Sequence, residues 1–201
     1  MARRRGPSQR PETFRFNHAS PLAQGLVFAH LGACTGSTTY KDSSPYSNDG
    51  TLSGFTGAGD LPQNRWSWSP TLRRPALSFD GVNDYVSAGN SGLPQGSDPR
   101  TVCTWFNFTG GSSDRFYLLS YGTASFKNSF ELFYGLDFNT APAADWYGAP
   151  LGLTPKLVPS GWTHAAVTWD GTNVLIYLNG QSVYSSSSAT GRSTALSQFG
   201  I

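Results

Sequence analysis

Short apolar runs separated by turn residues make up most of the chain, and no long amphipathic helical stretch lies among them. The run at 101–108 shows the pattern best, because its even-numbered residues from Val102 to Phe108 share one face of an extended strand while Cys103 and Trp105 share the other. We expect further strands in the remaining runs, at 25–31, 76–79, 84–89, 115–122, 129–136, 181–187 and 195–201. About eleven short strands at this spacing predict two packed antiparallel sheets.

A hairpin is predicted near the end of the chain. Two alternating apolar segments, 162–170 and 174–180, flank Gly171-Thr172-Asn173, which favours a tight turn. Because side chains alternate along each strand, one face of this hairpin must lie in the core.

The composition also favours strands joined by turns, with 23 glycines, 13 prolines and only 13% charged residues. We expect irregular structure at 35–50 and 51–75. The longest connection expected is 137–160, and connections of that length are often functional.

The chain is predicted to contain one domain, residues 21–201, preceded by a basic arm at 1–20. The arm has too few apolar residues to fold alone. It holds five arginines, Arg3, Arg4, Arg5, Arg10 and Arg15. With Glu12 as its single acid, the arm has a net charge of +4, so the rest of the chain is −2 against a total of +2. This balance argues against a nucleic-acid-binding surface on the body. Three alternatives stay open for the arm: it contacts phosphates, it docks on an acidic protein surface, or it is a solvated tail.

No export or membrane-spanning signal is expected. The charged start is not followed by an apolar stretch, and no run of about 18 apolar residues occurs. The cysteines are Cys34 and Cys103. We expect two small buried thiols, with a single disulfide as the alternative, and no disulfide framework.

Three sets of segments follow one another in a distinctive order: 42–54 with 75–89, 101–108 with 116–122, and 159–183. The last is the most specific, because a strand ending in Trp-Asp-Gly turns into a strand ending in Leu-Asn-Gly. Their order and spacing across 25–201 resemble the LamG-like jelly-roll family, which includes the pentraxins. The resemblance implies an all-β, two-sheet antiparallel sandwich of the concanavalin A-like type.

The sequence departs from the pentraxin pattern at two sites. Pentraxins pair a cysteine matching Cys103 with one on the strand matching 164–169, and that strand has no cysteine here. In the loop matching 126–129, the pentraxin calcium site uses an Asp-Asn pair. This chain has Lys127-Asn128, and a lysine ammonium repels a cation instead of coordinating it.

A third departure concerns the end of the fold. The family adds a last long strand after the one matching 198–201, beside the first strand, whereas this chain stops at Ile201. We therefore expect an open sheet edge beside 25–31. Three explanations stay open: the arm covers the edge, a neighbouring subunit donates a strand, or the chain is cut short.

No catalytic grouping is apparent, and we predict that the chain is not an enzyme. Glycoside hydrolysis requires two carboxylates facing one substrate. Of the two glutamates, Glu12 lies in the arm and Glu131 stands alone in its strand. The histidines, His18, His30 and His164, lack the signatures of nucleophilic or zinc sites. We expect His164 to pack at a strand end and His30 to lie in or near the first strand.

Two turns are candidates for a structural calcium ion, because hard cations bind clustered oxygen ligands. One contains Asp80, Asn83 and Asp84, and the other contains Asp42, Asn48 and Asp49. The alternative is that these residues only shape the turns, where Asp and Asn are common. No other cofactor is expected.

Aromatic residues in loop segments are the candidates for sugar binding: Trp66, Trp68, Trp146 and Tyr147. The alternative is that their rings cover apolar area on the sandwich.

Two hypotheses of function follow. LamG-like domains usually work outside cells, yet no export signal is present, and a virion protein meets both conditions because it leaves the host by lysis. The leading hypothesis is a non-catalytic bacteriophage decoration or fibre-associated protein on the virion surface, bound to protein neighbours as an oligomer. The alternative is an extracellular carbohydrate-binding adhesion module that recognises surface glycans. Fold-level analogy carries part of the leading hypothesis.

Overall fold

The computed structural model describes residues 17, 19–30, 38–55, 65–110, 115–125, 127–135, 141–145, 151–152, 160–187, 191–195 and 199–201. The arginines of the predicted arm, His18 and Cys34 lie outside these residues. One short 3-10 helix, η1 (Pro21–Ala23), precedes a series of strands. The strands are β1 (Thr39–Tyr40), β2 (Gly50–Ser53), β3 (Trp66–Ser69), β4 (Arg74–Leu77), β5 (Tyr85–Ala88), β6 (Arg100–Asn107), β7 (Arg115–Gly122), β8 (Ser129–Gly135), β9 (Ala141–Asp145), β10 (Leu151–Gly152), β11 (Trp162–Trp169), β12 (Val174–Leu178), β13 (Gln181–Ser186) and β14 (Phe199–Gly200).

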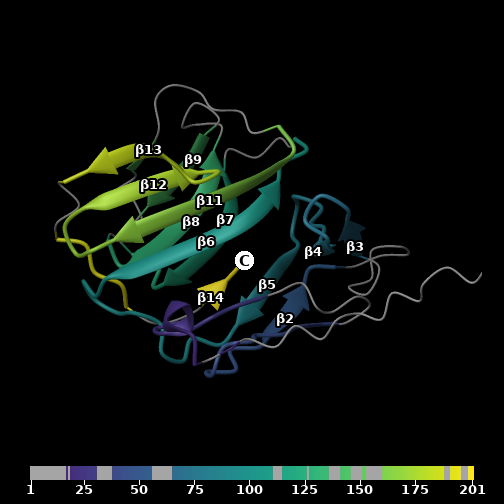
Figure 1. Cartoon of the computed structure of the whole chain (residues 1–201), viewed down its shortest axis with the longest axis horizontal. Coiled ribbons are helices and arrows are strands. Elements are labelled where there is room, and N and C mark those ends of the chain that lie inside the picture. The colour runs from purple at the N-terminus through teal and green to yellow at the C-terminus, as the bar shows by residue number, and fades with distance from the viewer. Residues whose placement is uncertain are drawn as a thin grey trace, which may run out of the picture.

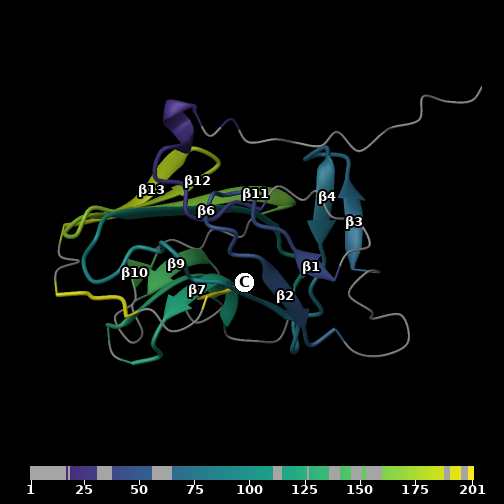
Figure 2. The same cartoon turned by 90° about the horizontal axis from the view of Figure 1, so that it is seen from below.

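The strands form two layers and a small separate hairpin. An eight-stranded sheet has the order β1-β2-β5-β14-β7-β8-β9-β10, and a four-stranded sheet has the order β13-β12-β11-β6. Figure 2 shows the two sheets stacked face to face, with the β3–β4 hairpin standing at one end. Every strand pairing is antiparallel. The predicted all-β, two-sheet sandwich is therefore confirmed.

The core lies between the two sheets. In β11 the burial alternates strictly, so that Ala165, Val167 and Trp169 point inward, and Val174 and Ile176 of β12 join them. Phe130, Leu132 and Tyr134 of β8 face them from the eight-stranded sheet. Each large side chain buried here contributes about 1.5–3 kcal/mol to stability. The predicted hairpin with one core face is thus confirmed.

Residues 25–30, which we call the strap, form no strand, so the prediction of a strand at 25–31 is wrong for its described part. Side chains of the following loop bind the backbone of the strap instead. Asp42 Oδ1 accepts the N–H of Ala29 at 2.8 Å, and the Oγ of Ser44 and the Nδ2 of Asn48 donate to the carbonyl of Val27 at 3.1 and 3.0 Å. These contacts satisfy polar groups that a neighbouring strand would otherwise satisfy. Strand β6 is the last strand on one side of the four-stranded sheet, and residues 25–28 of the strap line a hollow beside its start. The open edge expected beside 25–31 stays a prediction.

The last strand lies inside the eight-stranded sheet, between β5 and β7 (Figure 1). Gly200 lies opposite Ser87 on one side and Ser120 on the other. Ile201 extends this pairing with two backbone hydrogen bonds to Val86, of 2.7 and 3.0 Å. The chain therefore ends near the middle of the sheet.

Three further predictions are wrong. The segment 51–75 was expected to be irregular, yet its described parts include β3 and most of β2. The segment 137–160 was expected to be a connection, yet its described parts include β9 and β10. Cys103 was expected to be buried, but it lies exposed on the outer face of the four-stranded sheet, opposite Ala166. The inward face of β6 at this point is formed by Val102 and Thr104, in keeping with the alternation of the strand.

Candidate functional site

The aromatic residues singled out from the sequence fall in different environments. Trp66 is only 8% exposed, and its ring lies 5.4 Å from His30 and 6.0 Å from Tyr40. Trp68 of the same strand is 55% exposed. Trp146 and Tyr147 lie outside the described residues. Trp66 thus packs against the strap, and Trp68 is the candidate of this pair that faces solvent.

One carboxylate oxygen of Asp80 and one of Asp84 bind backbone N–H groups of the turn itself. Asp80 Oδ1 accepts the N–H of Val82 at 2.8 Å, and Asp84 Oδ2 accepts the N–H of Asp80 at 2.8 Å. The bond from Val82 is the main cause that holds the pKa of Asp80 below its usual range. No cluster of three His, Cys, Asp or Glu side chains suited to a metal occurs within the described ranges. Calcium binding at this turn stays a prediction.

A charged cluster lies on the outer face of the eight-stranded sheet. Glu131 of β8 lies directly opposite Asp145 of β9, and both point away from the core because their neighbours Leu132 and Ala144 point into it. Glu131 is 7% exposed and Asp145 is 0% exposed. Ser129 donates its hydroxyl to Glu131 Oε1 at 2.9 Å. Burial nevertheless raises the pKa of Glu131, because the loss of solvation of the charged carboxylate outweighs the lowering of the pKa by the Ser129 hydrogen bond.

Arg115 of β7 is the cation of this cluster. Its Nη1 donates to Asp145 Oδ2 at 3.2 Å, and its guanidinium carbon lies 4.9 Å from the centre of the Phe133 ring. About a third of the Arg115 side chain, 30%, is exposed. The guanidinium is therefore held by a carboxylate and by an aromatic face.

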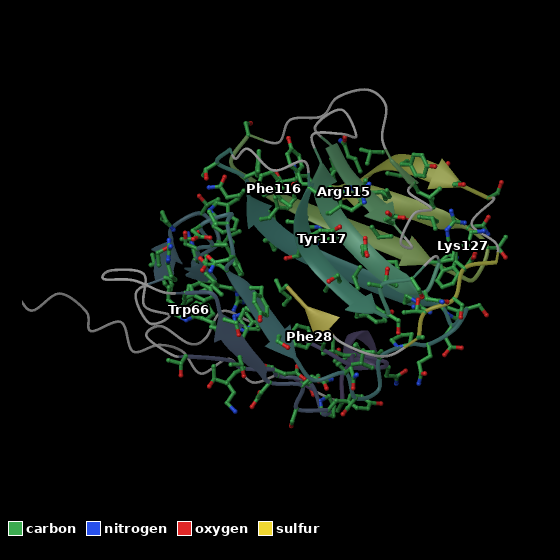
Figure 3. All side chains as sticks on the ribbon, turned by 180° about the vertical axis from the view of Figure 1, so that it is seen from behind. Phe28, Trp66, Arg115, Phe116, Tyr117 and Lys127 are labelled. Atoms are coloured by element: carbon green, nitrogen blue, oxygen red, sulfur yellow. The ribbon has the colours of Figure 1, made fainter. Side chains whose placement is uncertain are left out.

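Tyr117 stands beside this guanidinium on the same face, as Figure 3 shows for the labelled Arg115 and Tyr117. Its side chain is 49% exposed, and its ring centre lies 6.0 Å from that of Phe133. Burial of its lower part, followed by the charge of Glu131, raises the pKa of Tyr117. The phenol is therefore neutral at physiological pH, and it offers both a flat ring and a hydroxyl.

The remainder of this face carries hydroxyl groups and a second exposed tyrosine. Ser87 of β5 and Ser120 of β7 lie on either side of Gly200. Tyr85 is 51% exposed and lies on the same face of β5 as Ser87. Since β14 lies between β5 and β7, Tyr85 and Tyr117 are separated by roughly 10 Å across the sheet. We call Tyr85, Ser87, Arg115, Tyr117 and Ser120 the tyrosine face.

The tyrosine face can bind a flat, hydroxyl-rich ligand through ring stacking and hydrogen bonds. The neighbouring carboxylates do not face such a ligand from two sides, as glycoside hydrolysis requires. Asp145 is fully buried against Arg115, and Glu131 is buried against Ser129. Asp145 is thus placed to position the part-exposed Arg115.

Two hollows lie beside the turn at 170–173. The larger, of about 780 Å³, runs between the strap and the start of β6. Arg100 in its wall is 6% exposed and stacks on Trp169 at 4.8 Å. Its guanidinium donates to the hydroxyls of Tyr121 and Thr194 at 2.8 and 2.7 Å and to carbonyls of the loop at 95–98. These bonds use the donors of Arg100 within the protein.

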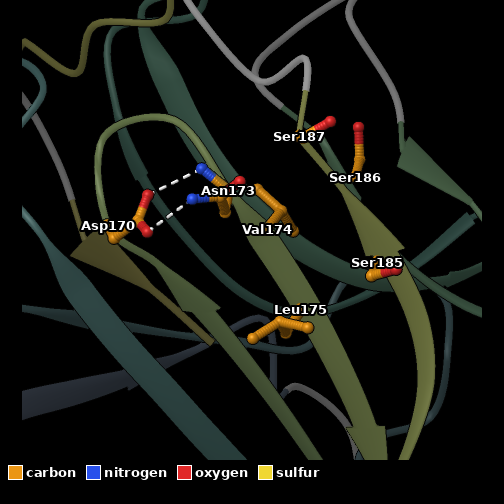
Figure 4. A pocket seen from close by; sticks show the side chains of 7 residues that line it. All are labelled: Asp170, Asn173, Val174, Leu175, Ser185, Ser186 and Ser187. Carbon is orange, nitrogen blue, oxygen red and sulfur yellow. Dashed lines mark hydrogen bonds between the residues drawn. The ribbon is translucent and has the colours of Figure 1, made fainter.

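The smaller hollow, of about 440 Å³, is lined by the turn and by the end of β13 (Figure 4). Asp170 Oδ1 accepts the N–H groups of Thr172 and Asn173 at 2.9 and 2.6 Å, and its Oδ2 accepts from Asn173 Nδ2 at 2.8 Å. The carboxylate therefore holds the turn together. In both hollows the charged group is engaged inside the protein, which favours the tyrosine face as the functional site.

A comparison with family models decides the class of this fold. The model described as "Concanavalin A-like lectin/glucanases superfamily" matches residues 80–200, more than half of the chain. The chain belongs to this superfamily. The LamG-like resemblance seen in the sequence is confirmed by the same match, since the matching model is Laminin_G_3.

Two solved structures are similar to this chain. Domain 4 of AbnA, a GH43 extracellular arabinanase from Geobacillus stearothermophilus, solved in complex with arabinotriose, aligns with a TM-score of 0.54 and 20% identity over 82% of this chain and 81% of that chain. The carbohydrate-binding module CBM66 from Bacillus subtilis aligns with a TM-score of 0.40 and 14% identity, over 75% of this chain and 84% of that one. The likeness to the arabinanase domain shows the fold alone, and the likeness to CBM66 carries no argument. A search of the curated proteins finds no match.

The sequence analysis of this concanavalin A-like domain singled out none of the five residues of the tyrosine face, and it missed Asp145 as well. Asp145 ends the short run Ala-Pro-Ala-Ala-Asp, which has little strand propensity. Arg115 and Tyr117 belong to a predicted strand, but the alternation alone does not say which of its faces is exposed. Within the described part of the chain, no helix is long and apolar enough to cross a membrane.

Proposed function

We propose that the chain is a non-catalytic carbohydrate-binding module whose ligand lies across the tyrosine face. One observation carries the proposal. Arg115, fixed by Asp145 and the Phe133 ring, stands beside the half-exposed Tyr117 on a sheet face that otherwise presents hydroxyls. Sugars have apolar C–H faces that stack on aromatic rings and hydroxyls that bond to fixed donors, so this surface fits their chemistry.

Membership of the lectin and glucanase superfamily supports the proposal, as does the arabinotriose complex of a domain with the same fold. Both arguments are analogies at the level of fold, which is why the named side chains carry the weight. The predicted virion-surface role, the assembly role of the arm and the extracellular location stay predictions, because no described residue bears on them.

The experiment is a binding screen of the whole chain by affinity electrophoresis against neutral and acidic polysaccharides, arabinan among them. For the best ligand, titration calorimetry then compares the wild type with Tyr117→Ala and Arg115→Ala. We expect each variant to bind about tenfold more weakly, a change of ~1.4 kcal/mol.

Two controls locate the site. Tyr46→Ala removes another exposed tyrosine, 46% exposed, that lies outside the tyrosine face, and should bind as the wild type does. Trp68→Ala tests the candidate named from the sequence. Loss of binding in Trp68→Ala with full binding in Tyr117→Ala would move the site to the β3–β4 hairpin. A chain that binds no member of the panel would refute the proposal.

A further inference from the structure

The outer face of the four-stranded sheet is uncharged. Strands β6, β11, β12 and β13 contain a single Lys, Arg, Asp or Glu, which is Arg100, and that side chain is buried on the inner side. Over the whole chain 13% of residues are charged. We call the outward-facing residues of these four strands the neutral face. The opposite sheet carries Arg115, Glu131 and Asp145 on its outer side, so neutrality is not a general property of this sandwich.

Large rings stand on the neutral face next to small side chains. Trp105 is 51% exposed, and its ring lies 5.2 Å from that of His164 across the strand pair. In the next row, Cys103, Ala166 and Tyr177 lie opposite one another. Soluble sheets usually carry charged residues on a solvent-facing side, and a broad uncharged surface with exposed rings marks a site of interaction.

We propose that the neutral face is the interface on which a second copy of this chain packs, sheet against sheet. Burying a charge without a partner is costly, so the occupant of an uncharged surface must itself be uncharged there. A two-fold pairing meets this condition directly, because it places the same patch on both sides of the interface. The small side chains of Cys103 and Ala166, beside the taller rings of Trp105 and Tyr177, make the uneven surface that two stacked sheets need at a separation of roughly 10 Å.

The size of the face sets the strength of this pairing. Four strands about 4.8 Å apart, the longest of eight residues at about 3.3 Å each, cover roughly 500 Å² per copy. The pair buries about 1,000 Å² in total, which is the lower bound of specific interfaces. The dimer is therefore weak and depends on concentration. Because the tyrosine face lies on the opposite sheet, both copies keep it exposed (Figure 2).

The test is sedimentation velocity of the whole chain over roughly a thousandfold range of concentration, where mass action moves a weak dimer from monomer to pair. A reducing agent is included so that the exposed Cys103 does not form crosslinks. Ala166→Glu places a carboxylate on the neutral face of each copy, and we expect dimerisation at least tenfold weaker. Ser87→Glu makes the same change of charge on the other sheet and should leave dimerisation unchanged. Trp105→Gln, an independent variant at the exposed ring, should weaken the dimer as well.

Several outcomes would overturn the interface. They are a monomer at every concentration, a dimer that Ala166→Glu and Trp105→Gln leave intact, or a dimer that Ser87→Glu weakens equally. If Ala166→Glu leaves the mass unchanged and removes polysaccharide binding, the neutral face is a glycan site instead. Polysaccharide binding that depends on Tyr117 is measured separately, so the interface and the proposed function can fail independently.

Discussion

Glu131 and Asp145 lie directly opposite each other on neighbouring strands, and both carboxylates are buried on the outer side of their sheet. Asp145 holds the guanidinium of Arg115, and Ser129 holds Glu131. Two acids that stand side by side in this superfamily suggest catalysis at first sight. Both are buried, and Asp145 fixes the part-exposed Arg115 while Glu131 is bound by the buried Ser129.

The first prediction concerns Asp145. Asp145→Asn keeps the shape of the side chain but removes the charge that holds Arg115. We expect the free energy of unfolding to fall by about 1–3 kcal/mol, because a buried charge-assisted bond is lost. Affinity for the polysaccharide should fall about tenfold, since the guanidinium is no longer fixed. Urea denaturation and calorimetry measure the two effects. A variant that loses stability but binds fully would show that Asp145 does not position Arg115 for the ligand.

The second prediction concerns the pH dependence that Glu131 imposes. Burial raises its pKa in the folded protein above the unfolded value of about 4.3. The folded state therefore binds the proton more tightly, so the free energy of unfolding falls as the pH rises from the unfolded pKa through the folded one. Glu131→Gln removes this dependence. Its stability relative to the wild type should increase over that window and stay constant above it. Equal pH profiles for the two proteins would contradict the burial of an ionised Glu131.

The third prediction concerns His30 in the strap. Burial lowers its pKa from 6.5 to about 4, and its ring stacks on Tyr40 at 3.4 Å. Neutral His30 is thus favoured by folding, and stability is lost as the pH falls from about 6.5 through about 4, by about 3 kcal/mol at most. His30→Phe retains the stack without a titrating group.

Urea denaturation between pH 7.5 and pH 4.5 (roughly the window in which a free His titrates) provides the measurement for His30→Phe. At pH 7.5 the free energy of unfolding of the variant should lie within about 1 kcal/mol of the wild-type value. This difference corresponds to the loss of one hydrogen bond, from His30 to the carbonyl of Lys41. At the lower end it should be the more stable protein. A constant difference across this range would show that His30 is not the group that titrates.

The fourth prediction tests how closely the end of β2 approaches the turn at Asp80–Asp84. Gly54 has a φ of 89°, and a Cβ at this position would lie 1.9 Å from the carbonyl oxygen of Asn83. Gly54→Ala should therefore destabilise the protein by more than about 2 kcal/mol, through backbone strain and a steric clash. Gly180→Ala is the matched control, because Gly180 has a φ of 82° and open space around it. It should cost only about 1 kcal/mol. Similar thermal denaturation midpoints for both variants would mean that the turn is not packed on Gly54.

The parts of the fold that were predictable are those where alternation, turn residues and length agree. The hairpin of β11 and β12 has all three, and Val167 and Ile176 lie in the core as the pattern requires. The strap has an equally apolar sequence, yet it forms no strand because Asp42 and Asn48 bind its backbone groups. Those contacts depend on how the following loop folds back, which no local pattern records.

The candidate site was less predictable than the fold for a related reason. Glu131 was visible as a lone acid in a strand, but its neighbour Asp145 becomes adjacent only through the pairing of β8 with β9. Trp66 and Trp68 are nearly identical in sequence context, and yet one is buried under the strap while the other is exposed. The register of β8 and β9 decides the first case, and burial by a distant segment of the chain decides the second. Residue type alone encodes neither of them.

The central claim is that a carbohydrate ligand lies on the tyrosine face. The most direct test is to titrate isotope-labelled protein with the best oligosaccharide and to map the backbone amide shifts by NMR. The account predicts that the largest changes lie at Tyr85, Ser87, Arg115, Tyr117 and Ser120, with the β3–β4 hairpin and β6 unaffected. Changes centred on Trp68 or on Trp105, with none at Tyr117, would contradict it.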